Sequence, residues 1–486
     1  MDDTTLHSLA GAAPATGSQR SLSSASSPAA VAGSYPPSKA PSEVQAPSAP
    51  LPDRGKAAYL FLAAAFTIET VIWGLPASYG ILLDYYDGHG VGGSGTGSSL
   101  LPLVGTVSSG FMYVLGPPVS LLLNPRPRWR VNVVRLGCCL CPLSLLLSSF
   151  AKAPWQLLLT QGLLYSIGGA MAYYSTFFYL QDWFHERRGF ANGVCFAGTA
   201  AGGLVLPFVL NALLRGYGAA VTLQALAVAT FLLLGAAVPV IRPRLPIPPS
   251  TETRRDRPEP VAGAASEPEV PRGAAGAAVT SKQLVKSVRL WAFLAANVLQ
   301  GFGYFVTLLY LPAFATSLGL SSANGSAVLA CVNGACVISR VAMGIMSDKK
   351  SPHQLGFFAM ATSAVAVSVL WGVASTTLAP LIVFAVVMGL CSGGWTSLYS
   401  AMIKSLKADD PSLAAHLFST FSFTRGLGAL LCAPIASALI SRPFSAASPR
   451  TAYGAANGEY GGIVLFAGMA LAAGAGLEGV EWLLAL

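Results

Sequence analysis

Charged residues are scarce in this sequence. Asp, Glu, Lys and Arg make up only 10% of its 486 residues, whereas they make up about 25% of a typical soluble domain. Hydrophobic residues account for 53% of the chain, and its mean hydropathy is +0.59. This composition excludes an ordinary soluble protein and predicts a chain that crosses a membrane several times.

Motifs that mark enzymes and nucleic-acid-binding proteins are also missing. The eight cysteines lie in apolar segments, and their spacing matches neither a metal site nor a disulfide framework. There is no GxSxG or P-loop motif, and the apolar segments hold too few carboxylates for hydrolytic chemistry. The formal net charge of +9 lies in the gaps between apolar segments and forms no basic face with interleaved aromatic residues. We therefore expect no enzyme, no catalytic residue, no metal, no cofactor and no nucleic-acid partner.

The N-terminal region, residues 1–56, is rich in Ala, Ser and Pro and holds few large apolar groups. Such a segment buries too little surface to offset the entropy lost on ordering, so we expect a disordered tail. A cleavable signal peptide is not expected, because the basic-then-apolar pattern that it needs does not precede the first apolar segment.

Twelve apolar segments follow, each of roughly 20 residues, the length that crosses about 30 Å of hydrocarbon. The expected helices are 57–83, 99–123, 131–151, 155–181, 190–213, 219–241, 289–315, 322–346, 353–374, 378–403, 413–440 and 460–484. A polar, Pro- and Arg-rich linker, 242–288, separates two six-helix bundles, 57–241 and 289–486. The sequence thus predicts an all-α membrane protein with twelve transmembrane helices in two bundles. In the fifth and eleventh segments, closely spaced glycines precede a proline (198–207 and 426–434), as a parallel repeat would leave.

Lys and Arg cluster in alternate loops between these segments. One set of loops and flanks, which includes the linker, holds most of them, whereas the other set holds only Lys152, Arg215, Arg442 and Arg450. Positive residues favour the cytoplasmic side of short loops. We therefore expect a multi-pass protein with both termini and the linker in the cytoplasm.

The stretch "WFHERRGFANGVCFAGTAAGG" (183–203) joins a charged cluster to a run of small residues. Arg187 and Arg188 fit a short cytoplasmic turn facing anionic headgroups. The glycine pairs that follow, at 189 and 193 and at 198 and 202, predict that the fifth helix approaches a neighbour closely.

The same stretch carries a family resemblance. With twelve helices in a 6+6 arrangement, the chain resembles the major facilitator superfamily and, within it, the fungal branch of the monocarboxylate-transporter family. The motifs that carry the resemblance are the aromatic pair, the Arg-Arg cluster and the glycines of 183–198, "WGLPASYGILLDYY" (73–86), "NGACVISRVAMGIMSD" (333–348) and "RGLGALLCAPIA" (425–436). The resemblance extends over residues 57–484.

This resemblance implies a secondary transporter for small organic anions in the plasma membrane, coupled to protons and working by alternating access. The partners implied are a small-molecule substrate, protons and the lipid bilayer. Two positions depart from the well-studied animal members: Ala77 stands where they have Lys, and Cys336 where they have Asp. The alternatives are therefore a transporter of a neutral metabolite or vitamin, or a non-transporting membrane sensor.

Three charged residues lie deep in apolar segments, where a charge costs at least about 2.5 kcal/mol. Glu69 lies about 18 Å into the first helix. There, burial favours its protonated form and suits it for proton coupling, with a structural hydrogen bond as the alternative. Arg340 matches a carboxylate bidentately and is the first candidate for substrate binding, with a cytoplasmic gate contact as the alternative. Arg425 is either a second anion contact, a partner for Glu69 or a structural residue.

Four uncharged residues complete the candidate substrate site. Trp73 shares the helix face of Glu69, and Asn333 shares that of Arg340. Tyr304 and Trp395, like Phe305 beside Tyr304, are aromatic residues placed to line a cavity at the membrane midplane, with ordinary packing as the alternative. His416 is expected at the membrane interface rather than as a proton carrier.

Overall fold

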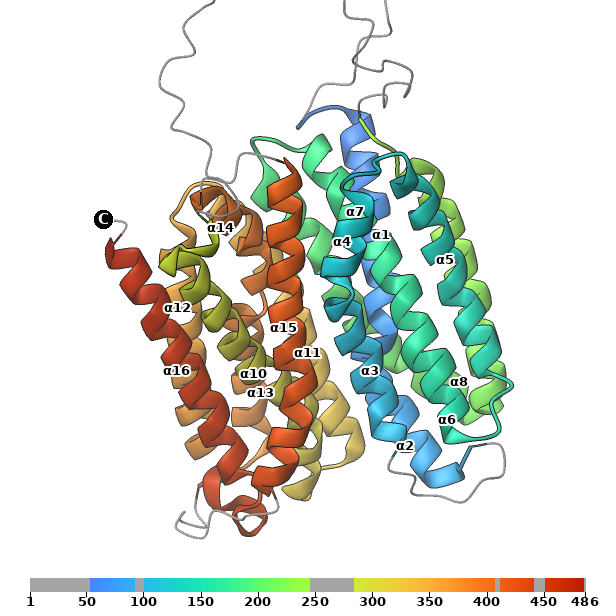
Figure 1. Ribbon diagram of the computed structural model, residues 1–486. Coiled ribbons are helices and arrows are strands. Elements are labelled where there is room, and N and C mark those ends of the chain that lie inside the picture. Colours follow the sequence, from blue (N-terminus) through green and yellow to red (C-terminus); the bar gives the residue numbers. More distant parts are fainter. Residues whose placement is uncertain (1–52, 92–99, 245–283, 407–410, 441–450, 485–486) are drawn as a thin grey trace, which may run out of the picture. The chain divides into compact units, whose positions relative to one another are not determined.

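The structure is a computed structural model that describes most of the chain between residues 53 and 484 (Figure 1). The described ranges are 53–91, 100–244, 284–406, 411–440 and 451–484. Almost all of these residues are helical, and none of them lies in a strand. Nearly all of the predicted disordered tail and most of the predicted linker lie outside the described residues.

The N-terminal half holds six spans, several of which consist of consecutive shorter helices. Its elements are α1 (Lys56–Ala77), α2 (Tyr79–His89), α3 (Leu101–Val114), α4 (Gly116–Leu123), α5 (Trp129–Ser148), α6 (Pro154–Leu157), η1 (Leu158–Leu164), α7 (Tyr165–Trp183), α8 (Arg188–Ala237) and η2 (Val238–Val240). The first span changes from α1 to α2 at Ser78, whose φ of −108° and ψ of 4° depart from helical values, two residues after Pro76. α8 comprises two spans, because Gly218 interrupts it with φ 76° and ψ 174°, a conformation that glycine adopts readily.

The C-terminal half has the same plan. Its elements are α10 (Val288–Ser317), α11 (Ser322–Ser347), α12 (Pro352–Val365), η3 (Ala366–Ala374), α13 (Leu378–Ser392), η4 (Trp395–Leu398), α14 (Tyr399–Ser405), α15 (Pro411–Ile440), η5 (Ala452–Gly458) and α16 (Gly461–Leu484). The ninth span consists of α12 and η3, and the tenth of α13, η4 and α14. Ser321 caps α11, since its side chain accepts a hydrogen bond from the backbone N–H of Asn324.

The helices account for twelve membrane crossings. Within the described ranges, ten helical segments are long and apolar enough to span a membrane. One of them, Arg188–Val240, counts twice because of the break at Gly218. The run from α6 to α7 supplies the remaining crossing, and most residues of α7 are buried against other helices instead of facing lipid. The predicted fold, twelve helices in two bundles of six, is confirmed.

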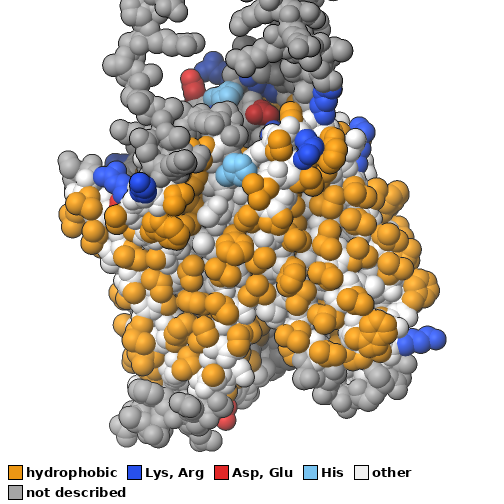
Figure 2. Space-filling view, in the orientation of Figure 1, with side chains coloured by type: hydrophobic (Ala, Val, Ile, Leu, Met, Phe, Trp, Pro, Cys, Tyr) orange, Lys and Arg blue, Asp and Glu red, His pale blue; other side chains and the backbone are white. Residues whose placement is uncertain are grey.

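The surface shows how the protein sits in a bilayer. Hydrophobic side chains cover the middle of the face seen in Figure 2, whereas Lys and Arg gather mainly at one end. We call the end at which α1 and α8 begin and α11 ends the basic end. Next to these helix termini in the sequence are Arg54, Lys56, Arg187, Arg188 and Lys349. Large apolar side chains left exposed on the helices, such as those of Leu121, Phe231 and Leu232, suit contact with lipid.

Two pairs of spans make the longest contacts between the halves. α8 packs along α11, and α15 packs along α3 and α4. Within the halves, α1 lies against α8, and α10 lies against α15 and α16. The lengthwise contacts between halves place any central site among α1, α3, α8, α10, α11 and α15.

Glycines of α8 permit these close approaches on two of its faces. A methyl group at Gly193 would collide with the backbone carbonyl of Arg340, and one at Gly189 with that of Gly344, both on α11. Gly198 and Gly202 face α1 in the same manner. The small-residue packing predicted for the fifth span is therefore present, and it serves two neighbours.

Equivalent glycine pairs occur in the two halves. A methyl group on Gly202 would lie 2.8 Å from Cα of Gly74, where α8 crosses α1. A methyl group on Gly428 would lie 3.0 Å from Cα of Gly301, where α15 crosses α10. The fifth span meets the first as the eleventh meets the seventh, which supports the parallel repeat suggested by the sequence.

Substituting Gly193 tests the α8–α11 contact. Because the opposing atom is backbone and cannot move aside, we expect Gly193→Ala to lower the free energy of unfolding by about 1–3 kcal/mol. Gly235, on the same element, has no atom within 4 Å of the place that a methyl group would take, so Gly235→Ala should be neutral or stabilising, because alanine favours helix. Thermal unfolding of both variants in one detergent checks this, and equal melting temperatures would contradict the packing described.

Candidate functional site between the two halves

Glu69 is a buried acid in the middle of α1. Its side chain is 2% exposed, and it lies about 20 Å along the helix from Lys56. The hydroxyl of Thr199, on α8, donates a hydrogen bond to its carboxylate at 3.0 Å. The charge of Arg340 acts on it electrostatically, but the ion pairs found in the described part of the chain do not join these two residues. Glu69 thus has a neutral partner and a more distant cation.

Arg340 lies on α11, about 10 Å from the end of that helix at Ser347. Its Nε donates to the backbone carbonyl of Gly393 at 3.1 Å, and its Nη1 donates to that of Phe196. Gly393 belongs to the C-terminal half and Phe196 to the N-terminal half. In this state, Arg340 therefore ties the halves together through backbone oxygens, as the alternative gate role requires.

Asn333 occupies the same side of α11, further from the basic end. Its amide donates to the backbone carbonyl of Gly203, on α8, at 3.3 Å and to that of Leu329 at 3.2 Å. One of its hydrogen bonds therefore crosses the interface between the halves. The position agrees with its expected place beside Arg340.

Arg425 is the most deeply buried cation of the interface, with 1% of its surface exposed. Its Nη1 donates to Oε1 of Gln300, and its guanidinium lies over the rings of Tyr304 and Phe305 at 5.0 and 5.1 Å. Its Nε has no hydrogen-bond partner, and no carboxylate of the described residues lies within 4.0 Å of it. A buried cation without a counterion is costly, so the arrangement is suited to receive an anion.

Aromatic rings from both halves surround this guanidinium. The ring of Tyr113, on α3, lies 4.5 Å from that of Trp73 and 6.3 Å from that of Phe305. The rings of Tyr304 and Phe305 lie 5.4 Å apart. We call Trp73, Tyr113, Tyr304 and Phe305 the central aromatic cluster. Three residues that the sequence marks as candidates, Trp73, Tyr304 and Phe305, thus meet beside Arg425, while Tyr113 joins them through contacts that the sequence does not reveal.

Trp395 does not belong to this cluster. Its indole N–H donates to Oδ1 of Asn297 at 2.7 Å, and its ring stacks on Phe293 at 5.9 Å, inside the C-terminal half. The hydroxyl of Tyr399 donates to the same oxygen at 2.8 Å. For Trp395, the packing alternative therefore describes what the structure shows. Asn297, a polar residue in an otherwise apolar stretch, is the signal that would have revealed this network.

The path from Arg425 to the basic end is filled by an aromatic plug of Phe177, Phe196 and Phe418. The ring of Phe418 stacks on Phe177 at 3.3 Å and lies 6.2 Å from Phe196. Phe418 precedes Arg425 by about 10 Å along α15. The plug joins elements of both halves at the level where Arg340 binds Phe196.

Two polar contacts close the basic end beyond the plug. Asp348 accepts hydrogen bonds from the backbone N–H groups of Gly189, at 2.8 Å, and Phe190, at 3.0 Å. These groups open α8, and a carboxylate is favoured at such a helix N-terminus. On the other interface, the ring nitrogens of His416 hydrogen-bond to Ser120 and Asn124, each at 3.1 Å. The structure is therefore closed toward the basic end.

A second buried acid lies away from the interface. Glu478, on α16, accepts a hydrogen bond from Nδ1 of His353 at 2.9 Å, and Nε2 of that ring lies 3.3 Å from the Ser405 hydroxyl. These contacts connect α16 with α12 and α14 inside the C-terminal half. The sequence shows an acid at this position within the last apolar segment. In the structure, Glu478 holds helices together and does not join the candidate site.

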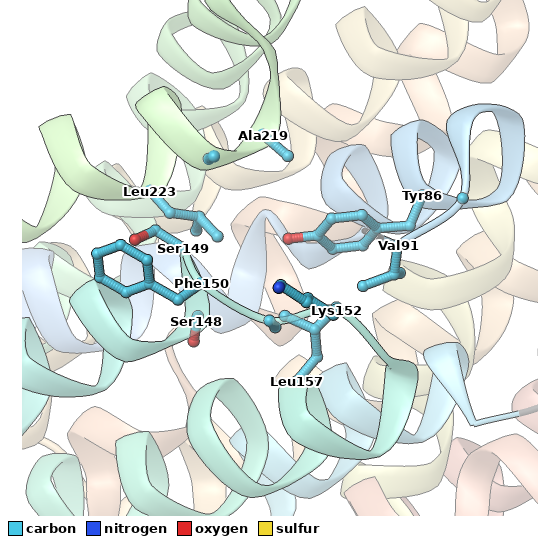
Figure 3. A pocket seen from close by; sticks show the side chains of 12 residues that line it. Tyr86, Val91, Ser148, Ser149, Phe150, Lys152, Leu157, Ala219 and Leu223 are labelled. Atoms are coloured by element: carbon cyan, nitrogen blue, oxygen red, sulfur yellow. The ribbon is translucent and has the colours of Figure 1, made fainter. Parts of the chain in front are cut away.

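A pocket of about 360 Å³ occurs at the other end of the N-terminal half. Tyr86, Val91 and Leu223 line it together with Lys152, the only charged residue among the described residues that line it (Figure 3). None of these described lining residues comes from the C-terminal half. It is separate from the residues that surround Arg425.

A family comparison agrees with this architecture. The family model described as Major Facilitator Superfamily matches residues 128–433, more than half of the chain. The chain belongs to the Major Facilitator Superfamily. A solved structure of the superfamily transporter FucP, in the outward conformation, matches 87% of this chain and 99% of its own with a TM-score of 0.58. At 11% sequence identity, that similarity shows the fold alone.

Several fungal relatives match most of the chain. The MFS transporter asaE of Aspergillus flavus is 26% identical over 90% of this chain and 89% of its own length. The aspyridones efflux protein apdF of Emericella nidulans is 24% identical over 83% and 75%. The fujikurins efflux protein of Gibberella fujikuroi is 26% identical over 80% and 77%. The superfamily and these relatives identify the chain as a multi-pass membrane transporter and not an enzyme.

The charged loop between α7 and α8 binds a carboxylate from the chain before α1. Asp53 accepts hydrogen bonds from the backbone N–H groups of His185, Glu186 and Arg187, each at 3.0 Å. Burial alone would raise the pKa of Asp53, but these hydrogen bonds and the nearby His185 hold it below its ordinary value of 3.8. Asp53 thereby fixes the start of α1 to the loop from which α8 begins.

Removing the Asp53 charge should destabilise the transporter in a pH-dependent manner. A lowered pKa means that the ionised form stabilises the fold above the unfolded value, near 3.8, and that this contribution disappears as pH falls through the folded value. Asn tolerates the φ of 58° found at this position, so Asp53→Asn should change mainly the charge. We expect a loss of about 1–3 kcal/mol at pH 7 that shrinks below pH 3.8. Thermal unfolding against pH measures it, with exposed Asp84→Asn as the control. An unchanged melting temperature at pH 7 would contradict the contact.

Asp348→Asn should weaken closure of the basic end. Losing the carboxylate charge at the α8 N-terminus should destabilise the closed state by about 1–3 kcal/mol. The ratio of closed to open molecules should then fall roughly five- to 150-fold. Cys195, buried on α8, should then react faster with N-ethylmaleimide, as measured by peptide mass spectrometry. Lys350→Gln, beside the contact, is the matched control. Equal Cys195 labelling in wild type and Asp348→Asn would show that this contact does not hold the gate.

Proposed function

We propose that the protein is a proton-coupled secondary transporter for small organic anions that works by alternating access, as its resemblance to the monocarboxylate-transporter family implies. The observation that carries the proposal is the guanidinium of Arg425, buried between the halves with an unpartnered Nε and no carboxylate beside it in the described residues. In this proposal the substrate carboxylate binds Arg425, while Trp73, Tyr304 and Asn333 line the space around it.

Alternating access requires the basic-end contacts to break. The Asp348 contact with α8, the His416 contact with α4 and the aromatic plug all join the two halves at that end. When the halves rock apart there, these contacts open together and the central site faces the other side. The glycine-lined crossings of α8 and α15 support the rocking, because their close-packed backbones move as rigid units.

Arg340 has two successive roles in this cycle. While the basic end is closed, its guanidinium binds backbone carbonyls of both halves. When the halves separate, the Phe196 carbonyl leaves and an N–H group becomes free. Arg340 then offers the departing or arriving anion a second cation nearer the basic end, which unites its substrate and gate interpretations.

Glu69 carries the coupled proton. It is buried with Thr199 as its neutral partner, and the charge of Arg340 acts on it. An uncompensated carboxylate is costly to move through a low-dielectric barrier, so the protonated form is the one that reorients with the bound anion. Release of the proton on the other side resets the site.

The basic end is proposed to face the cytoplasm, with both termini there, in the plasma membrane. The predicted tail, 1–56, and linker, 242–288, would lie on that side. Two of the relatives are named as efflux proteins for aspyridones and fujikurins, which favours export of a larger metabolite as a second candidate function. A neutral substrate or a sensor role would leave the charge of Arg425 unexplained.

Transport by the full chain in proteoliposomes tests this proposal. Uptake of radiolabelled lactate, pyruvate and salicylate would be followed with and without a proton gradient. Arg425→Gln should reduce uptake about 30-fold or more, because removing one partner of a buried charge pair costs roughly 2–5 kcal/mol. Glu69→Gln should preserve exchange of labelled for unlabelled anion but abolish accumulation driven by the gradient.

Exposed Lys350→Gln is the control for loss of a positive charge, and its uptake should equal that of the wild type. Anion uptake that survives Arg425→Gln would overturn the assigned site. Gradient-driven accumulation that survives Glu69→Gln would overturn the coupling assignment. Failure of every anion to enter, with a folded protein, would contradict the proposed substrate class.

A further inference from the structure

The groups around Arg425 restrict the kind of anion that fits. Apart from Gln300, the described side chains that contact its guanidinium are aromatic, and the rings of Tyr304 and Phe305 lie against it at 5.0 and 5.1 Å. Tyr113 and Trp73 extend the same set of rings into the N-terminal half. A substrate held by Arg425 therefore lies among π-surfaces contributed by both halves.

The central aromatic cluster is larger than a two- or three-carbon acid requires. From Arg425, successive contacts lead to Phe305 at 5.1 Å, from there to Tyr113 at 6.3 Å, and on to Trp73 at 4.5 Å. A short aliphatic acid bound at the guanidinium would leave the far rings untouched. A planar ring system would contact them, and each aromatic pair contributes about 0.5–1.5 kcal/mol beyond the area that it buries.

Two buried N–H donors mark opposite ends of this cluster. Nε of Arg425, in the C-terminal half, and Nε1 of Trp73, in the N-terminal half, are both without a hydrogen-bond partner. Buried donors are seldom left without an acceptor. Gln300 already accepts a hydrogen bond from Nη1 of Arg425. The two N–H donors of this cluster that remain without an acceptor are therefore Nε of Arg425 and Nε1 of Trp73.

We infer that the substrate is an organic acid whose carboxylate is joined to a flat conjugated ring system that carries an oxygen acceptor at its far end. This inference rests on the proposed anion transport and names its substrate class. The carboxylate binds Arg425 through Nε, the ring system lies among Phe305, Tyr113 and Tyr304, and the distal oxygen accepts the hydrogen bond of the Trp73 indole. Such a molecule contacts both halves and so responds to their relative movement.

Equilibrium binding to the full chain in lipid nanodiscs tests the ring requirement. Benzoate and cyclohexanecarboxylate have the same number of carbon atoms and the same charge, but only benzoate is flat. We expect benzoate to bind at least tenfold more tightly than cyclohexanecarboxylate or propionate. Phe305→Leu should reduce that preference severalfold. Phe302→Leu is the matched control, because the Phe302 ring lies 5.5 Å from Phe466, on α16, outside the cluster.

A second pair of ligands tests the distal acceptor. 4-Acetylbenzoate and 4-isopropylbenzoate have similar shapes, but only the acetyl compound offers a carbonyl oxygen. We expect the wild type to prefer 4-acetylbenzoate about fivefold or more. Trp73→Phe removes the indole N–H and keeps a ring, so it should abolish this preference while leaving the benzoate-to-cyclohexanecarboxylate ratio unchanged.

The outcomes separate this inference from the proposed function. If propionate and cyclohexanecarboxylate bind as tightly as benzoate, and Arg425→Gln abolishes all binding, the inference is overturned while anion transport stands. If Phe305→Leu and Phe302→Leu act alike, or if Trp73→Phe keeps the acetyl preference, the assigned cluster is wrong. If neutral benzamide binds and no carboxylate does, the proposed function itself fails.

Discussion

The guanidinium of Arg425 lies between the two halves, without a carboxylate among its described neighbours. It is held by the amide of Gln300, by the ring faces of Tyr304 and Phe305 and by side-chain hydrogen bonds with Tyr113 and Tyr399. These contacts replace part of the hydration that the cation loses, since an arginine is more weakly hydrated than a lysine and stacks on rings. They leave the charge uncompensated. A built-in carboxylate would stabilise the resting protein and also occupy the place of a substrate. In the proposed function, the incomplete shell around Arg425 is therefore what lets an anion bind there reversibly.

The rest of the interface isolates that charge from one side. Arg340, Asp348 and His416 each connect the halves nearer the basic end, and each does so through groups that water can replace when the halves part. Between them lies the plug around Phe418. Glu69 lies on the N-terminal side of the same region, so in the proposed cycle its protonation would alter the electrostatic cost of anion movement past Arg340. The proposed binding and gating steps would thus be linked by charge as well as by shape.

The sequence reveals the fold more readily than the site. Apolar length and positive loops predict the twelve helices, and the glycine pairs of the fifth span predict its close packing. Helical spacing also places Trp73 with Glu69 and Asn333 with Arg340. It does not reveal which neighbour each face meets, because that depends on the rotation of helices far apart in sequence. For this reason the sequence does not predict that Trp395 pairs with Asn297 inside one bundle, or that Arg340 binds backbone carbonyls instead of an acid. It also does not predict that Gln300 and Tyr113 contact Arg425.

The most direct measurement is an electron cryo-microscopy map of the full chain in nanodiscs with 4-iodobenzoate, whose iodine marks the end of the molecule opposite the carboxylate. The account predicts density between the halves, with the carboxylate against Arg425 and the iodine toward Trp73 and Tyr113. Ligand density bound to Arg340 alone, or lying outside the interface between the halves, would contradict it.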